Sequence, residues 1–165
     1  MGEFTFEDMR MITREKLGDQ VPLELFRAIR LIGMYQGLPM GGKGTTVTIG
    51  RKIGESIPAN SLEQLLAKFE ELKVGIPRIV ERSKNTIRVA VDDCFCEGLP
   101  AQEGKLVCDL EGAIMEGALT RIHGKRVTVR EVKCNVNGDT HCEYEIRILN
   151  SRPNYTYTGS LTVKA

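Results

Sequence analysis

The stretch RVTVREVKCNVNGDTHCEYEIRIL, residues 126–149, decides the fold because it predicts a β-hairpin with a cysteine on each side of its turn. Every second residue from Cys142 to Ile148 is uncharged and the residues between them are charged, which is typical of a strand with one buried face. Asn137-Gly138 is a typical hairpin turn. A loop of three or five residues places Cys134 across from Cys142, whereas a loop of two residues turns the thiols to opposite faces. The alternation favours the register that brings them together.

The first strand of this hairpin changes its buried parity along its length. Val127 and Val129 share one parity, and Val132 and Cys134 share the other. A β-bulge near Arg130-Glu131 produces such a shift and would turn Glu131 towards Cys134.

The N-terminal half of the chain predicts helices. The first begins at Pro22 and runs to Gly37, with an apolar stripe of Leu25, Phe26, Ile29 and Ile32. Residues 45–57 fit a strand or a helix, and the helix is favoured. Ser61 and Gln64 form a capping box for a third helix that Gly75 can cap. We expect the helices between residues 22 and 73 to pack on the sheet and enclose an apolar pocket.

The remaining elements are strands with one inserted helix. Ile87, Val89 and Val91 alternate with polar residues and predict a strand that pairs with residues 76–83. A helix is expected between Pro100 and Gly124, with Cys108 in its first turn, and Gly112 and Gly117 indicate that another element approaches it closely. Residues 1–20 can form a strand, and the tail from 151 to 165 is either a further strand or an appendage.

This order of elements predicts an α+β fold, a mostly antiparallel sheet covered by helices on one face. We expect residues 1–165 to form a single domain, with a core at about 22–149 and a zinc-binding half at 94–149. The chain has 165 residues, enough for a core that needs no disulfides.

Composition narrows the function. With 41% hydrophobic and 27% charged residues the chain is expected to fold, and its formal net charge of +1 supplies no field for binding nucleic acid or anionic lipid. No secretory signal and no apolar run long enough to cross a bilayer are found, so we expect a cytoplasmic protein without nucleic-acid or membrane partners. In that reducing compartment an odd, clustered set of five cysteines, at positions 94, 96, 108, 134 and 142, indicates metal binding before disulfides.

The candidate metal ligands are Cys108, Glu131, Cys134 and Cys142. Four protein ligands leave zinc no open position, so the site would be structural. His123 or His141 can replace Glu131, and the plainer alternative is a set of small buried residues beside an incidental glutamate. Nearby Arg121, Lys125, Arg126, Arg130 and Lys133 are expected to offset the negative charge.

The elements Glu131-x-x-Cys134 and Gly138-Asp139-x-x-Cys142-x-Tyr144 resemble the C-terminal signature of the vinyl-4-reductase-type small-molecule-binding domain. The resemblance implies zinc bound by the four candidate residues and a fold similar to TRAPP vesicle-tethering subunits and to the ligand-binding domains of NO signalling and Golgi transport. It also implies a homodimer and a hydrophobic or aromatic small-molecule ligand, as in the sensory domains of phenol-responsive activators. The chain has no tryptophan, and the ligand contacts of those sensors match no residue here.

We therefore expect a non-catalytic sensor or carrier with a structural zinc. One alternative is a reductase acting on a vinyl group of a tetrapyrrole, which the family name suggests although no dinucleotide fingerprint accompanies it. The other is a protein-interaction module similar to the tethering subunits. Cys94 and Cys96 can form a redox pair, a second metal site or a pocket wall, and buried packing is favoured. The sequence from Gly37 to Thr45 nearly matches a phosphate-binding loop, but an interhelical connection is favoured.

Overall fold

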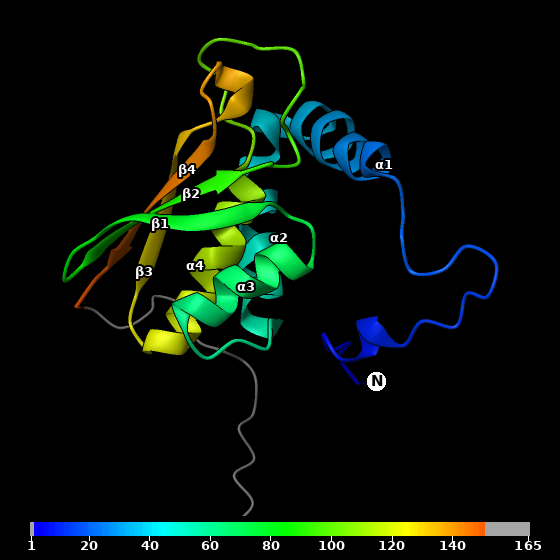
Figure 1. Cartoon of the computed structure of the whole chain (residues 1–165), viewed down its shortest axis with the longest axis horizontal. Coiled ribbons are helices and arrows are strands. Elements are labelled where there is room, and N and C mark those ends of the chain that lie inside the picture. The colour runs from blue at the N-terminus through cyan, green and yellow to red at the C-terminus, as the bar shows by residue number, and fades with distance from the viewer. Residues whose placement is uncertain (1, 151–165) are drawn as a thin grey trace, which may run out of the picture.

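A computed structural model describes residues 2–150 of the chain. Its centre is a four-stranded antiparallel sheet in the order β1-β2-β4-β3, with helices on one face (Figure 1). The strands are β1 Ile76–Arg82, β2 Thr86–Asp92, β3 Val127–Lys133 and β4 Cys142–Ile148. The α-helices are α1 Leu23–Arg27, α2 Lys43–Ser56, α3 Leu62–Glu71 and α4 Asp109–His123. A π-helix η2 spans Ala28–Gln36, and short 3₁₀ helices are η1 Asp8–Arg10, η3 Pro39–Gly42 and η4 Asn135–Asn137. The α+β prediction is confirmed.

Helix α4 lies between the sheet and α2, and glycines set both approaches. A Cβ atom on Gly112 would lie 3.3 Å from the ring of Tyr144 on β4. On the other side, a Cβ on Gly117 would collide with the backbone of Arg51, and one on Gly54 would lie 2.7 Å from the amide nitrogen of Ala118. The close approach expected at the two α4 glycines is confirmed.

The β3–β4 hairpin has the predicted faces. Its register shifts between Glu131 and Lys133, beside the predicted bulge, and Lys133 then pairs with Glu143. Cys134 and Cys142 are both fully buried on the helix side. The predicted loop of three or five residues is wrong, because η4 occupies the connection and the Asp139 carboxylate accepts the Cys134 backbone N–H at 2.9 Å.

Helix α3 begins at the predicted cap but ends differently. Ser61 Oγ accepts the Gln64 N–H at 3.1 Å, and the Gln64 side chain reaches back to the N–H of Asn60. Gly75 does not cap this helix: Lys73 takes the left-handed backbone conformation instead, with φ of 59°. Gly75 is required for contact, since a Cβ there would collide with Val91.

The first predicted helix is observed, but its apolar stripe does not face the core. Leu25, Ile29 and Ile32 are 48%, 54% and 66% exposed, and Arg30 is the residue that is buried, at 2%. The wider π-helical turn changes which side chains share a face, and Arg30 points inward because carboxylates meet it there. The expectation that this helix packs on the sheet is wrong; it lies against the segment after β2.

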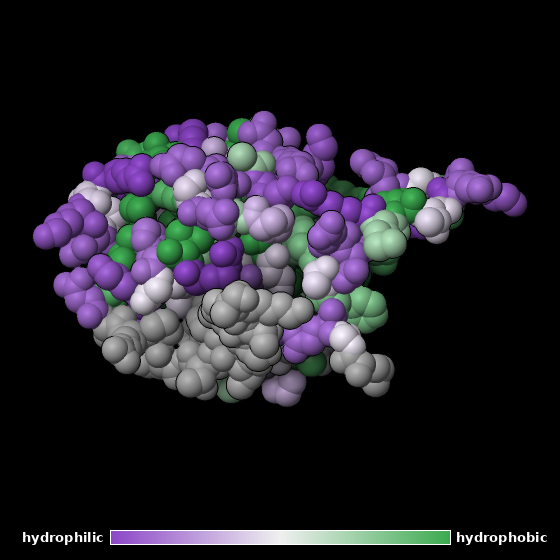
Figure 2. Space-filling model, turned by 90° about the horizontal axis from the view of Figure 1, so that it is seen from below, coloured by the Kyte–Doolittle hydropathy of each residue, from purple (hydrophilic) through white to green (hydrophobic). Residues whose placement is uncertain are grey.

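The remaining surface agrees with a charged exterior. Beyond the cluster of apolar residues under the helices, Figure 2 shows mainly hydrophilic side chains with scattered apolar patches. Residues 2–20 contain the 3₁₀ helix η1 and no strand. The strand considered for 151–165 lies outside the described residues. Within those residues, no helix combines the length and the apolar character needed to span a bilayer.

Candidate metal centre

The structure brings all four predicted ligands together at one end of the hairpin. Cys134 directly follows β3, Cys142 begins β4, and Cys108 immediately precedes α4 instead of lying in its first turn. Cys108 Sγ lies 3.8 Å from Cys134 Sγ and 3.7 Å from Cys142 Sγ. With a carboxylate oxygen of Glu131, the four ligand atoms all lie within 4.8 Å of one another. A tetrahedral zinc with Zn–S bonds of about 2.3 Å separates its sulfurs by about 3.8 Å, so the donor set fits this ion.

Glu131 is the member whose environment points most directly to a cation. One of its carboxylate oxygens accepts the Cys108 backbone N–H at 3.0 Å. The other, Oε1, is buried and has no hydrogen-bond partner among the described residues. Burial, with the adjacent charge of Cys134, raises the pKa of Glu131 to about 10. A buried carboxylate oxygen without a donor is costly, and a bound metal ion would satisfy it.

Neighbouring groups hold the ligands in place. The Tyr144 hydroxyl donates to the Cys108 carbonyl at 2.9 Å, and Arg30 donates to the carbonyl of Val107 at 3.0 Å. Hydrogen bonds from Cys108 and then Cys142 lower the pKa of Cys134 to about 6, which favours the thiolate that a metal requires.

The charge compensation expected from the sequence is wrong in its residues. Arg121 donates to the carbonyls of Ile57 and Ala59. Lys133 and Arg130 pair with Glu143 and Glu145 on the sheet face away from the thiols. These cations are engaged elsewhere because strand alternation turns them outward.

The buried cation near the thiols is Arg30, which the sequence analysis did not single out. Its guanidinium lies 3.1 Å from Glu111 and 3.5 Å from Asp109, both in the first turn of α4 after Cys108. The signal was a lone arginine within an apolar helix. Burial opposes its charge, but Glu111, Asp109 and Cys108 raise its pKa overall.

Neither histidine joins the centre. His141 Nε2 lies 3.0 Å from a carboxylate oxygen of Glu143, and no group of potential metal ligands among the described residues includes a histidine.

Cys94 and Cys96 are packed into the same cluster. Cys96 Sγ lies 3.3 Å from Cys108 Sγ and 3.4 Å from Cys142 Sγ, and Cys94 Sγ lies 3.7 Å from Cys108 Sγ. These four thiols form a second group whose sulfurs all lie within 4.8 Å of one another. The buried packing favoured from the sequence is confirmed, and its location against the predicted ligands is an addition.

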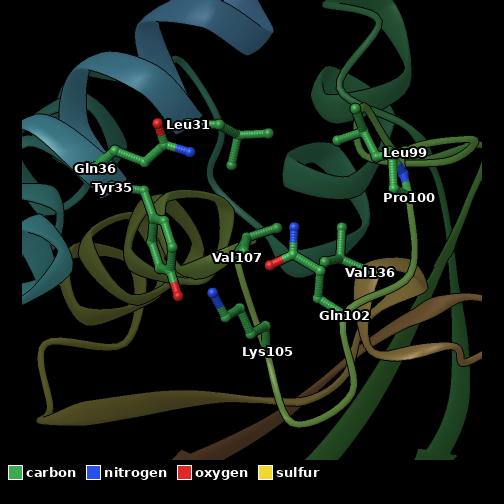
Figure 3. A pocket seen from close by; sticks show the side chains of 9 residues that line it. All are labelled: Leu31, Tyr35, Gln36, Leu99, Pro100, Gln102, Lys105, Val107 and Val136. Atoms are coloured by element: carbon green, nitrogen blue, oxygen red, sulfur yellow. The ribbon is translucent and has the colours of Figure 1, made fainter.

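A cavity of about 150 Å³ adjoins the cluster (Figure 3). It lies between η2 and the segment that precedes α4, not between helices and the sheet as predicted. Its lining is Leu31, Tyr35, Gln36, Leu99, Pro100, Gln102, Lys105, Val107 and Val136. Val107 directly precedes Cys108, and Val136 follows Cys134 by two residues.

The segment that resembles a phosphate-binding loop is an interhelical connection, as favoured. It contains η3, in which Met40, Gly41 and Gly42 have φ near +54°, +68° and +67°.

The sheet, the helices on one face and the buried cysteine cluster define a small α+β domain of a recognised class. Comparison with sequence families matches residues 87–148 to the vinyl-4-reductase domain. The chain belongs to the vinyl-4-reductase family.

Related sequences extend this similarity over most of the chain. The uncharacterized protein MJ0745 of Methanocaldococcus jannaschii is 30% identical over 138 residues, which are 83% of this chain and 72% of that protein. The uncharacterized protein MJ1642 of the same organism is 25% identical over 139 residues, 84% of each chain.

Solved structures share the fold. A vinyl-4-reductase family protein of M. jannaschii has a TM-score of 0.60 at 18% identity, covering 87% of this chain and 88% of its own. A trafficking protein particle complex subunit 3 from Naegleria fowleri, covalently bound to palmitic acid, has a TM-score of 0.62 at 12% identity and covers 79% and 95%. The phenol-responsive sensory domain of the transcription activator PoxR, solved with phenol, has a TM-score of 0.56 at 14% identity and covers 78% and 75%.

Proposed function

We propose that this protein is a non-catalytic small-molecule sensor or carrier in which a structural zinc ion binds to Cys108, Glu131, Cys134 and Cys142. The observation that carries the metal assignment is the buried, unpartnered oxygen of Glu131 beside three buried thiols. Four protein ligands close the coordination sphere, so the ion would link α4 to the hairpin and supply no site for substrate. On this proposal residues 22–149 form one domain, with 94–149 as its metal-binding half.

The ligand would occupy the cavity beside η2. Its walls are aliphatic, with the Tyr35 ring and the polar ends of Gln36, Gln102 and Lys105 available to orient a polar substituent. An apolar cavity of about 150 Å³ is the size that takes one benzene-like ring. The sensory-domain relative solved with phenol supports this ligand class. Because Val107 adjoins Cys108, a ligand in the cavity would contact the same segment that the zinc holds.

Binding of phenol and toluene to the full chain tests this proposal. Calorimetry with the wild type should detect one site, and Val136→Phe, which fills the cavity, should abolish the heat. Val80→Phe is the matched control, because Val80 is exposed on β1. Equal binding by both variants would refute the cavity assignment. Consumption of NADH with a vinyl tetrapyrrole would instead favour the reductase alternative.

A homodimer is also proposed, on the exposed stripe of Leu25, Ile29 and Ile32. Contiguous exposed apolar side chains on a helix are typical of an interaction surface. Light scattering should give twice the chain mass for the wild type, and a monomer for Ile29→Lys. A monomeric wild type would refute this part of the proposal.

A further inference from the structure

The cysteine cluster contains more metal ligands than one zinc ion can use. Five thiols and the Glu131 carboxylate are six donors, and tetrahedral zinc binds four. The proposed structural site leaves Cys94 and Cys96 over. Both are buried, 3% and 0% exposed, in direct contact with the thiols of that site.

The two groups of potential ligands overlap in a regular way. One consists of Cys108, Glu131, Cys134 and Cys142, and the other of Cys94, Cys96, Cys108 and Cys142. The shared thiols, Cys108 and Cys142, are 3.7 Å apart, close to the edge of about 3.8 Å expected for a zinc–thiolate tetrahedron. Two tetrahedra that share one edge require six ligands, which is the number present.

We propose that the cluster binds two zinc ions, the second held by Cys94 and Cys96 and bridged to the first through the thiolates of Cys108 and Cys142. This inference rests on the proposed function, because the first ion supplies the bridging thiolates. It gives the two cysteines after β2 the role of metal ligands.

The segment that carries the two additional cysteines is held rigidly from outside. Arg27 donates hydrogen bonds of 2.7 Å to the carbonyls of Phe95 and Glu97. The Phe95 ring packs edge to face against Phe26, with centroids 5.3 Å apart. Asp93 has a φ of 53°, a left-handed conformation that turns the chain directly after β2. Both thiols are thereby fixed against the hairpin before any ion binds, which is what a metal site requires.

The charge of the cluster also permits a second ion. One zinc with three thiolates and a carboxylate has a formal charge of −2. A second zinc brings two positive charges together with two further thiolates, so the total is unchanged. Arg30, whose guanidinium is held by Glu111 next to Cys108, stays the nearby buried cation in either case.

Metal content of the wild-type chain tests the inference without any variant. The protein would be purified from zinc-supplemented cells with a reductant and no chelator, and zinc measured against protein by elemental analysis. Two ions per chain are expected, and reconstitution with ¹¹³Cd should give two cadmium resonances that are coupled through the bridging sulfurs. One ion per chain, or one cadmium resonance, overturns the second site and leaves the proposed structural site intact. A chain without metal overturns both.

A matched pair of variants assigns the ligands. Cys94 belongs only to the second group and Cys134 only to the first, so Cys94→Ala and Cys134→Ala should each retain one of two ions. If a single ion is bound, Cys94→Ala keeps it and Cys134→Ala loses it, which refutes the proposal. Loss of a sole ion in Cys96→Ala, with Cys94→Ala unaffected, likewise refutes it and indicates one ion held by four thiolates.

Discussion

Replacing Arg30 with methionine tests how the π-helix is held to the metal-bearing segment. The Arg30 side chain and its partner Glu111 are each only 3% exposed, and the guanidinium also lies 3.5 Å from Asp109. Removing one member of a buried ion pair leaves the other charge uncompensated, at a cost of about 3–5 kcal/mol. With a urea dependence of about 2.5 kcal/mol per molar, the unfolding midpoint should fall by about 1 to 2 M.

The pH dependence of this loss follows from Glu111. Burial raises the pKa of Glu111, and Arg30 opposes that rise. Without Arg30 the pKa in the folded state rises further above its unfolded value. A protonated Glu111 is then favoured by folding, and this contribution is present at low pH and lost as the pH rises through the folded-state pKa. The penalty of Arg30→Met should therefore be smaller at pH 5 than at pH 8.

Two controls make the result specific. Arg82→Met removes an exposed ion pair with Glu63 and should leave the free energy of unfolding nearly unchanged. Adding Glu111→Leu to Arg30→Met removes both buried charges and should recover part of the loss. Urea titrations of the zinc-loaded chains measure all of these. A loss no larger than that of Arg82→Met, or a penalty that grows at low pH, would refute the reasoning.

Three further results are expected. Gly54→Ala should destabilise by about 1–3 kcal/mol in thermal unfolding, because its Cβ would push α2 from α4, whereas Gly44→Ala on the same helix, with nothing within 4 Å, should be neutral or stabilising; equal effects would contradict the packing. Tyr144→Phe should cost about 1–3 kcal/mol by leaving the Cys108 carbonyl without its hydroxyl donor, and an unchanged melting temperature would exclude that role. Zinc removal by a chelator should lower the melting temperature, and retention should weaken as the pH falls because protons compete for the thiolates; a melting curve insensitive to chelator would show that the metal does not stabilise the fold.

The hairpin and its ligands could be predicted because their signals are local. Strand alternation from Cys142 fixed the buried face, and the parity change between Val129 and Val132 revealed the bulge that turns Glu131 inward. The features that could not be predicted depend on contacts distant in the chain. Arg30 is buried only because Glu111, 81 residues away, meets it.

The position of Cys94 and Cys96 had the same difficulty. A strand reading puts both on one face, but their approach to Cys108 depends on the left-handed turn at Asp93 and on Arg27 from α1. Neither signal stands out in a single sequence. The cavity moved for a related reason, since the π-helical register decides which side chains of η2 point inward.

Anomalous diffraction from crystals of the zinc-loaded protein tests the central claim most directly. Data collected on both sides of the zinc absorption edge should place an anomalous peak within about 2.0–2.3 Å of the sulfurs of Cys108, Cys134 and Cys142 and of a Glu131 oxygen. A structure of the loaded protein with no zinc peak among these four side chains would contradict it.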